Sequence, residues 1–136
     1  MQTEEDNLLS YTLPKREKLC SQNAFDQLLN AGQSFFHFPY KCYFFVQEGN
    51  ASDLYNQFAI AVPKRIFKHA VDRNLLKRKT REAYRLHKHI LFPKTINQNK
   101  TISILFVYMS KKMLTSQQID ESMTHLLAHL SLKIHD

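Results

Sequence analysis

An amphipathic basic segment in the middle of the chain sets the strongest limit on how this chain can fold. The pattern predicts a helix that begins near His69 or Ala70 and ends near His89. At about 100° per residue, the basic side chains and one Asn share about 140° of its circumference: Arg73, Asn74, Lys77, Arg78, Arg81, Arg85 and Lys88. Apolar residues occupy the opposite arc and need a surface to cover them. We therefore expect this helix to pack on a β-sheet, with Lys79 reaching out from the edge of the apolar side.

The remaining elements are shorter and surround this helix in the order αβββαβα. Apolar spacing and turn residues predict helices at about 22–30 and 117–132 and strands at 57–62 and 101–109. Residues 34–46 are expected to form two short strands, or one bent strand, with Pro39 at the junction. Ser21 and Ser116 are the expected N-caps. We expect the strand ending at Val46 to form a hairpin with 57–62, and the apolar run 58–62 to be central in the sheet. The strand that ends at Val46 should carry Lys41, Tyr43 and Phe45 on one face and Cys42, Phe44 and Val46 on the other.

A length of 136 residues fits one domain. Together with the element order above, this length predicts a single-domain α+β sandwich with a four-stranded sheet. Residues 1–10 are acidic and polar and are expected to be disordered, so the folded domain should span 11–136.

Positive charge is concentrated in one segment. Residues 64–88 hold ten Lys and Arg and two acids, a net +8, whereas the whole chain carries +7. A solvated charged face would normally alternate acids with bases, and a membrane-surface helix would not need a sheet beneath it. The concentration therefore favours a polyanionic partner. The Phe- and Tyr-rich strands offer stacking surfaces for unpaired bases, which favours RNA over DNA.

Other chemistry is poorly supported. His87 and His89 point in different directions, and His125 and His129 lack a further ligand for zinc. Cys20 and Cys42 have no CxxC spacing and are expected to be reduced. No catalytic residue or metal site is predicted, and no apolar run approaches the ~18 residues of a membrane span. We expect a cytoplasmic protein with no membrane partner.

The motifs in the basic region resemble the protein subunit of bacterial ribonuclease P. The matching segments are Phe58-Ala-Ile-Ala-Val-Pro-Lys-Arg65, Lys68-His-Ala-Val-Asp-Arg-Asn74, Lys77-Arg78 and Arg81-Glu-Ala-Tyr-Arg85. The family reads Arg-Asn-Arg where this chain has Arg73-Asn74-Leu75, so any contact of the second Arg cannot be carried over to Leu75.

The resemblance implies a ribonucleoprotein endonuclease that removes the 5′ leader of precursor tRNA. In that family the catalyst is a large RNA that uses Mg²⁺, and the protein binds the catalytic RNA and the leader, assists metal binding by the RNA and holds no tight cofactor itself. It also implies a left-handed βαβ crossover around the basic helix, against the usual rule, and a monomer within the complex. The alternative is a general RNA-binding structural protein of ribosomal type, with no role in cleavage. A stand-alone nuclease would need a carboxylate cluster for metals.

Two groups of site residues follow from the pattern and the resemblance. Phosphate contacts are expected from Lys77, Lys88 and the arginines of the helix, and from the cations before it, while Asn74 suits a base or a 2′-hydroxyl. The leader cleft should be lined by Phe25, Lys41 and Tyr43, and Leu29 stands where an aromatic would complete it. The expected RNA-binding set is Lys64, Arg65, Lys68, Arg73, Asn74, Lys77, Arg78, Arg81, Arg85 and Lys88.

Overall fold

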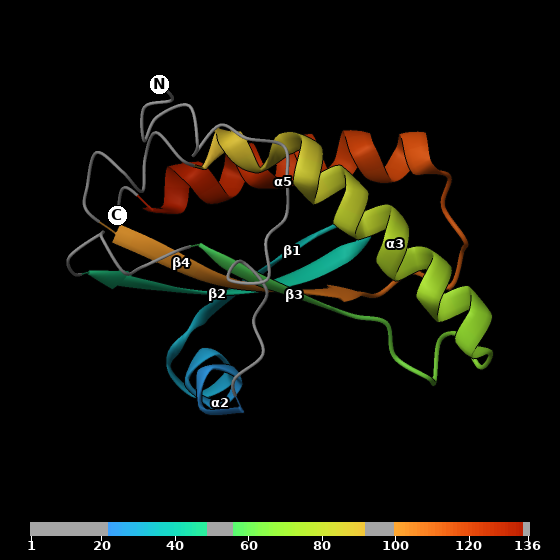
Figure 1. The fold of residues 1–136 in the computed structure, drawn as a ribbon, viewed down its shortest axis with the longest axis horizontal. Helices are drawn as coiled ribbons and strands as arrows, with labels where there is room; N and C mark the ends of the chain where they lie inside the picture. The colour runs from blue at the N-terminus through green and yellow to red at the C-terminus, as the bar shows by residue number, and fades with distance from the viewer. Residues whose placement is uncertain (1–21, 49–55, 92–99, 135–136) are drawn as a thin grey trace, which may run out of the picture.

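The computed structural model describes residues 22–48, 56–91 and 100–134, and it has the expected α+β architecture. The elements are α2 (Gln22–Ala31), β1 (Gln33–His37), β2 (Tyr40–Glu48), β3 (Gln57–Ala61), α3 (Ala70–His87), the short 3₁₀ helix η3 (Lys88–Ile90), β4 (Lys100–Tyr108) and α5 (Ser116–Ile134). Helices α3 and α5 cover one face of the sheet, and α2 lies on the other (Figure 1). The predicted order αβββαβα is confirmed. The expected disorder of residues 1–10 lies outside the described residues.

The sheet has the strand order β1-β2-β4-β3. The chain breaks at Pro39 into two strands, β1 and β2, which is one of the two predicted arrangements. Their pairing as an antiparallel hairpin was not predicted. The expected hairpin between β2 and β3 is wrong, because β2 pairs with β4 and β3 pairs with β4 in parallel. The expected central place of 58–62 is also wrong, since β3 is an edge strand. Its apolar character has another cause: Phe58 stacks on Tyr84 of α3 at 4.3 Å between ring centroids, whereas Ala59 and Ala61 pack on the opposite face.

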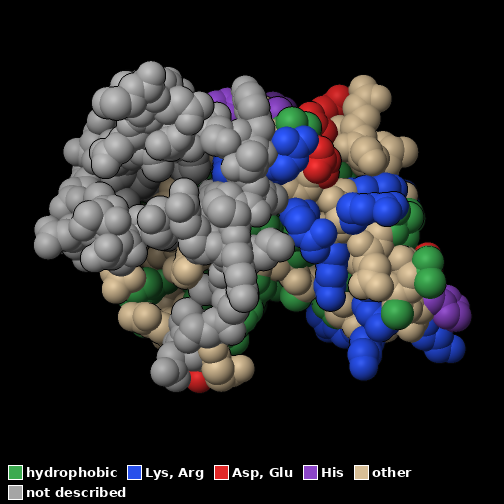
Figure 2. All heavy atoms as spheres, viewed as in Figure 1, with side chains coloured by type: hydrophobic (Ala, Val, Ile, Leu, Met, Phe, Trp, Pro, Cys, Tyr) green, Lys and Arg blue, Asp and Glu red, His purple; other side chains and the backbone are tan. Residues whose placement is uncertain are grey.

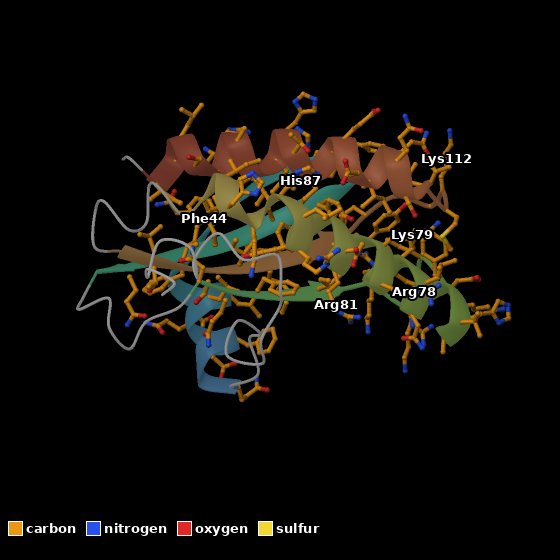
Figure 3. The ribbon with its side chains drawn as sticks, turned by 45° about the horizontal axis from the view of Figure 1, so that its top comes forward. Phe44, Arg78, Lys79, Arg81, His87 and Lys112 are labelled. Carbon is orange, nitrogen blue, oxygen red and sulfur yellow. The ribbon has the colours of Figure 1, made fainter. Side chains whose placement is uncertain are left out.

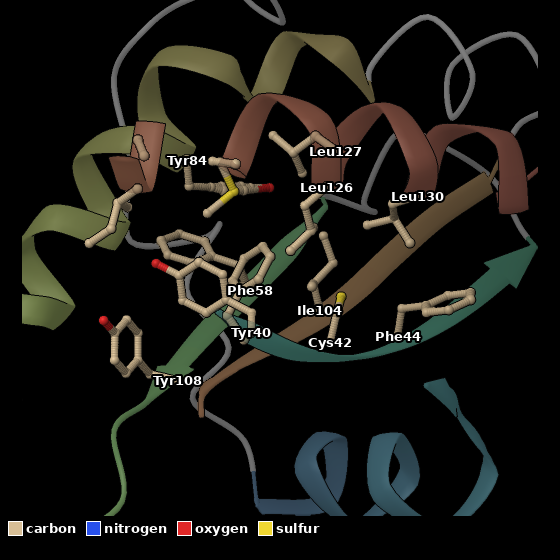
Figure 4. Close-up of a cluster of buried hydrophobic side chains, with 14 of the residues drawn as sticks. Tyr40, Cys42, Phe44, Phe58, Tyr84, Ile104, Tyr108, Leu126, Leu127 and Leu130 are labelled. Atoms are coloured by element: carbon tan, nitrogen blue, oxygen red, sulfur yellow. The ribbon is translucent and has the colours of Figure 1, made fainter. Parts of the chain in front are cut away.

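The main core lies between the sheet and the pair α3 and α5 (Figure 4). Cys42 and Phe44 point into it, whereas Tyr43 and Phe45 belong to a smaller cluster on the other face, so the predicted alternation along β2 is confirmed. We call that second face the open face; α2 covers it in part through Leu28, which is 1% exposed.

Gly32 fixes the position of α2 against the sheet. Its N–H donates to the Leu28 carbonyl at 3.1 Å and ends the helix. A Cβ at this position would lie 2.3 Å from the Leu28 oxygen and 2.8 Å from the Phe44 oxygen. Only glycine lets the end of α2 approach the backbone of β2 this closely.

The start of α5 is capped by Thr115 and not by the predicted Ser116. The Gln118 N–H donates to Thr115 Oγ1 at 3.1 Å, and the Thr115 N–H donates to Gln118 Oε1 at 2.9 Å. This reciprocal pair is a capping box. It fixes the connection from β4 to α5 beside α3.

Candidate nucleic-acid interface

A row of cations follows α3 and the segment before it. Figure 2 shows Lys and Arg side chains along this side of the molecule, with few acids among them. Of the predicted RNA-binding set, six residues are exposed, Lys64, Arg65, Lys68, Asn74, Arg78 and Arg81, and Lys77 is half-buried. We call the six cations of this group the cationic face: Lys64, Arg65, Lys68, Lys77, Arg78 and Arg81. Arg78 and Arg81 project outward from α3 (Figure 3).

The cationic face stays exposed because the other side of α3 packs on the sheet and α5. Leu76 and Thr80 are fully buried, and Ala83 and Tyr84 lie in the same row. Thr80 donates to the Leu76 carbonyl at 2.8 Å and also hydrogen-bonds the buried Tyr40 hydroxyl of β2. These contacts set the rotation of α3 about its axis, and therefore which side chains face solvent.

Arg73 has a positioning role that the sequence analysis did not anticipate. Its Nη1 donates to the carbonyls of Phe67 and Lys68, each at 2.8 Å. The guanidinium thus ties down the segment that enters α3, and it holds Lys68 next to the helix. Arg73 is half-buried in this arrangement, so it contributes to the interface mainly by holding other residues.

Arg85 is paired within the protein. It forms a salt bridge with Glu82, one turn earlier, and its Nε donates to Glu82 Oε2 at 3.2 Å. This hydrogen bond holds the pKa of the Glu82 carboxyl below its ordinary value. The expected contact of Arg85 with phosphates stays a prediction, and in this structure its guanidinium is already paired with a carboxylate.

Lys88 does not reach the cationic face. It is 3% exposed and belongs to η3, where the chain tightens after α3 ends at His87. The backbone of His87, with φ −116° and ψ 0°, departs from α-helical geometry just before Lys88, so the angular position expected for a continuing α-helix no longer holds. We remove Lys88 from the candidate RNA-binding residues on this ground.

Lys79 lies at the edge of the apolar side, as predicted. It is half-buried, and its Nζ donates to the Leu114 carbonyl at 3.0 Å, which joins α3 to the connection before α5. Two further cations in that connection, Lys111 and Lys112, are exposed and were not among the predicted residues. Lys112 and Lys79 lie toward the same end of the molecule (Figure 3). The signal in the sequence was a Lys-Lys pair in the short connection that follows β4.

The three residues expected to line the leader cleft share the open face. Phe25 of α2 and Tyr43 of β2 are half-buried in the cluster formed with Leu28 and Leu105. The Lys41 ammonium lies over the Tyr43 ring, 5.2 Å from its centroid. The structure therefore brings an aromatic surface and a cation together beside α2. Leu29, on the same helix, is 53% exposed.

The histidines considered above as metal ligands make structural contacts in the fold. His87 Nε2 lies 2.8 Å from Asp120 Oδ1 and links the end of α3 to α5. His125 stacks on His37 and His129 lies against Phe35, so the pair is drawn toward β1. Within the described ranges, no group of three or more His, Cys, Asp or Glu side chains could hold a metal ion.

Cys42 is buried, and burial raises the pKa of its thiol; Cys20 lies outside the described residues. No described helix is long and apolar enough to cross a membrane.

The fold and this surface define a small α+β protein with an exposed cationic helix, a class suited to binding a folded polyanion. Comparison with known proteins gives the family. The Ribonuclease P family model matches residues 13–131, so the chain belongs to the ribonuclease P protein family. It is thus a subunit of the endoribonuclease of tRNA 5′ maturation and associates with ribonuclease P RNA.

Individual relatives agree with this assignment. The chain is 28% identical over 123 residues to the ribonuclease P protein component of Porphyromonas gingivalis strain ATCC 33277, covering 90% of this chain and 88% of the relative. The fold is similar to the RNase P protein of Staphylococcus aureus (TM-score 0.62, 23% identity, 84% of this chain and 94% of the other). It is also similar to that of Thermotoga maritima (TM-score 0.65, 21% identity, 83% and 96%).

Proposed function

We propose that the two surfaces of this chain divide the work of the ribonuclease P subunit between them. The cationic face binds the catalytic RNA, and the open face beside α2 holds the single-stranded 5′ leader of precursor tRNA. The observation that carries the proposal is the exposure of the cationic face on a helix whose opposite side is locked into the core. The chain acts as one copy within the ribonucleoprotein, in the cytoplasm.

The chemistry of the cationic face supports its contact with RNA. Arg78 and Arg81 present planar guanidinium groups, which bind phosphate oxygens through two parallel hydrogen bonds. The two lie three residues apart on α3 and are both exposed. Asn74, exposed near them, both donates and accepts hydrogen bonds and can address a base edge or a 2′-hydroxyl.

The composition of the open face supports leader binding. Phe25 and Tyr43 offer ring surfaces on which unpaired bases can stack, and Lys41 supplies a positive charge for the adjoining phosphate. A surface of this kind tolerates many sequences because every base has a π-face. It therefore suits a leader whose sequence differs from one precursor tRNA to the next.

Catalysis is proposed to remain with the RNA. Magnesium would act there on the scissile phosphate, bound mainly by RNA oxygens, and this chain would supply charge and position. The described part of the chain presents no carboxylate cluster for a metal. The protein's contribution is then to neutralise phosphates, so that RNA and substrate can approach each other when Mg²⁺ is scarce.

Reconstitution tests the proposal. The full-length protein is titrated into ribonuclease P RNA at limiting Mg²⁺, and cleavage of precursor tRNA is followed. We expect no cleavage by the protein alone and a rise in rate that saturates with added protein. A flat rate across the titration, with the protein bound to ribosomal RNA instead, would favour the general RNA-binding role.

A further inference from the structure

An exposed aromatic on the edge strand extends the open face beyond the residues identified so far. Phe36 of β1 is 59% exposed, whereas its neighbour Phe35 packs against the main core. The alternation of a strand therefore turns Phe36 toward the open face.

The register of the sheet places Phe36 in line with the leader surface. Phe36 is the direct cross-strand partner of Lys41, and Lys41 is that of Val107 in β4. Val107 in turn pairs with Ala61 at the end of β3. One row thus crosses all four strands on the open face, from Phe36 to Ala61.

The row ends next to the cationic face. Three residues after Ala61, the chain reaches the exposed Lys64 and Arg65. At the β1 end of the row, Lys41 stands between two rings. Phe36 is its partner on β1, and Tyr43 lies two residues further along β2, with its ring centroid 5.2 Å from the Lys41 ammonium. This alternation of cation and ring suits single-stranded RNA, because each of its phosphates is followed by a base.

We propose that Phe36 is a further leader-binding residue, which stacks a base of the 5′ leader at the β1 edge of the sheet, beyond the bases held at Tyr43 and Phe25. The proposal rests on the proposed function of the open face. Single-stranded RNA is the occupant favoured by the charge of Lys41 between the rings. A second copy of this chain, paired through edge strand β1, is the competing occupant.

The composition of the chain provides the probe, since it contains no Trp. Phe36→Trp introduces the chain's one Trp, which keeps an aromatic surface at the site and can be excited apart from the six tyrosines. Phe38→Trp is the matched control, because Phe38 is 54% exposed but lines a hollow of about 280 Å³ with Gln118 and Glu121 of α5. Each variant is assembled with ribonuclease P RNA and titrated with precursor tRNA carrying a non-cleavable linkage at the leader junction.

We expect leader-dependent quenching for Phe36→Trp and none for Phe38→Trp. With leaders of increasing length, the quenching should begin only when the leader is long enough to pass Tyr43. Phe36→Ala should weaken binding of the long-leader substrate about tenfold, the loss expected for one base–aromatic stack. Binding of leaderless tRNA should not change.

Three results would overturn the inference. The first is equal quenching at both positions, and the second is wild-type affinity of Phe36→Ala for the long-leader substrate. The third is a concentration-dependent dimer of the free protein that Phe36→Ala abolishes, which would assign the residue to self-association. If wild-type holoenzyme itself gains no affinity from the leader, the proposed function of the open face fails, and this outcome is separate from a failure at Phe36.

Discussion

The salt dependence of RNA binding offers a quantitative test of which cations meet phosphates. The sequence pattern predicted nine cations in contact with RNA, but the structure engages Arg73 with backbone carbonyls, pairs Arg85 with Glu82 and buries Lys88. Six remain on the cationic face. Each phosphate neutralised contributes about 0.7 to 0.9 to the log–log salt slope, so six contacts predict a slope of about −4 to −5.

The assay compares alanine variants over a range of monovalent salt, with Mg²⁺ held constant. Arg78→Ala and Arg81→Ala should each make the slope shallower by about 0.7 to 0.9. Arg85→Ala combined with Glu82→Ala removes the pair without leaving its carboxylate unpaired, and it should change the slope by much less than Arg78→Ala. An equal change in slope for this double variant and for Arg78→Ala would refute the assignment of Arg85 to an internal pair.

Three further predictions concern the scaffold that holds these surfaces. Tyr40→Phe removes the buried hydrogen bond to Thr80 and should lower the free energy of unfolding by about 1–2 kcal/mol; an unchanged urea midpoint would contradict this. Gly32→Ala forces a Cβ against the Leu28 and Phe44 carbonyls and should cost about 1–3 kcal/mol, with weaker binding of leader-bearing substrate and unchanged affinity for the catalytic RNA. Burial raises the pKa of the Cys42 thiol above its ordinary value of 9.0. The buried neutral thiol therefore contributes its full share of the free energy of unfolding below pH 9.0. That share declines above pH 9.0, where the thiol ionises only in the unfolded chain. Cys42→Ser in a Cys20→Ser background should flatten the alkaline fall in thermal midpoint, and an identical fall in both proteins would be evidence against this cause.

Local patterns in the sequence predicted local structure well. The period of the basic helix, the Pro39 break between β1 and β2 and the two faces of β2 all follow from spacing over a few residues. Strand pairing does not follow from such spacing, because 51 residues separate the end of β2 from the start of β4. The preference of β2 for β4 over β3 depends on packing across the whole sheet. The apolar run in β3 is typical of a strand covered on both faces, and it does not distinguish an edge strand from a central one.

The errors at the site have equally local causes that spacing could not reveal. A helical wheel assumes one geometry throughout, so it placed Lys88 on a face that ends when the helix tightens at His87. It also counts every cation as available, whereas Arg73 bonds carbonyls in the segment before α3 and Arg85 pairs with Glu82 one turn earlier. The Thr115 cap, in contrast, was readable: Gln118 three residues later completes the capping-box pattern.

The binding of ribonuclease P RNA by Arg78→Glu combined with Arg81→Glu tests the central claim most directly. Both side chains are exposed and lie away from the buried row of α3, so the variant should unfold at the same denaturant concentration as the wild type. We expect its affinity for the RNA to fall by at least two orders of magnitude, since two attractions become repulsions. Wild-type affinity in this folded variant would show that α3 is not the surface that binds the RNA.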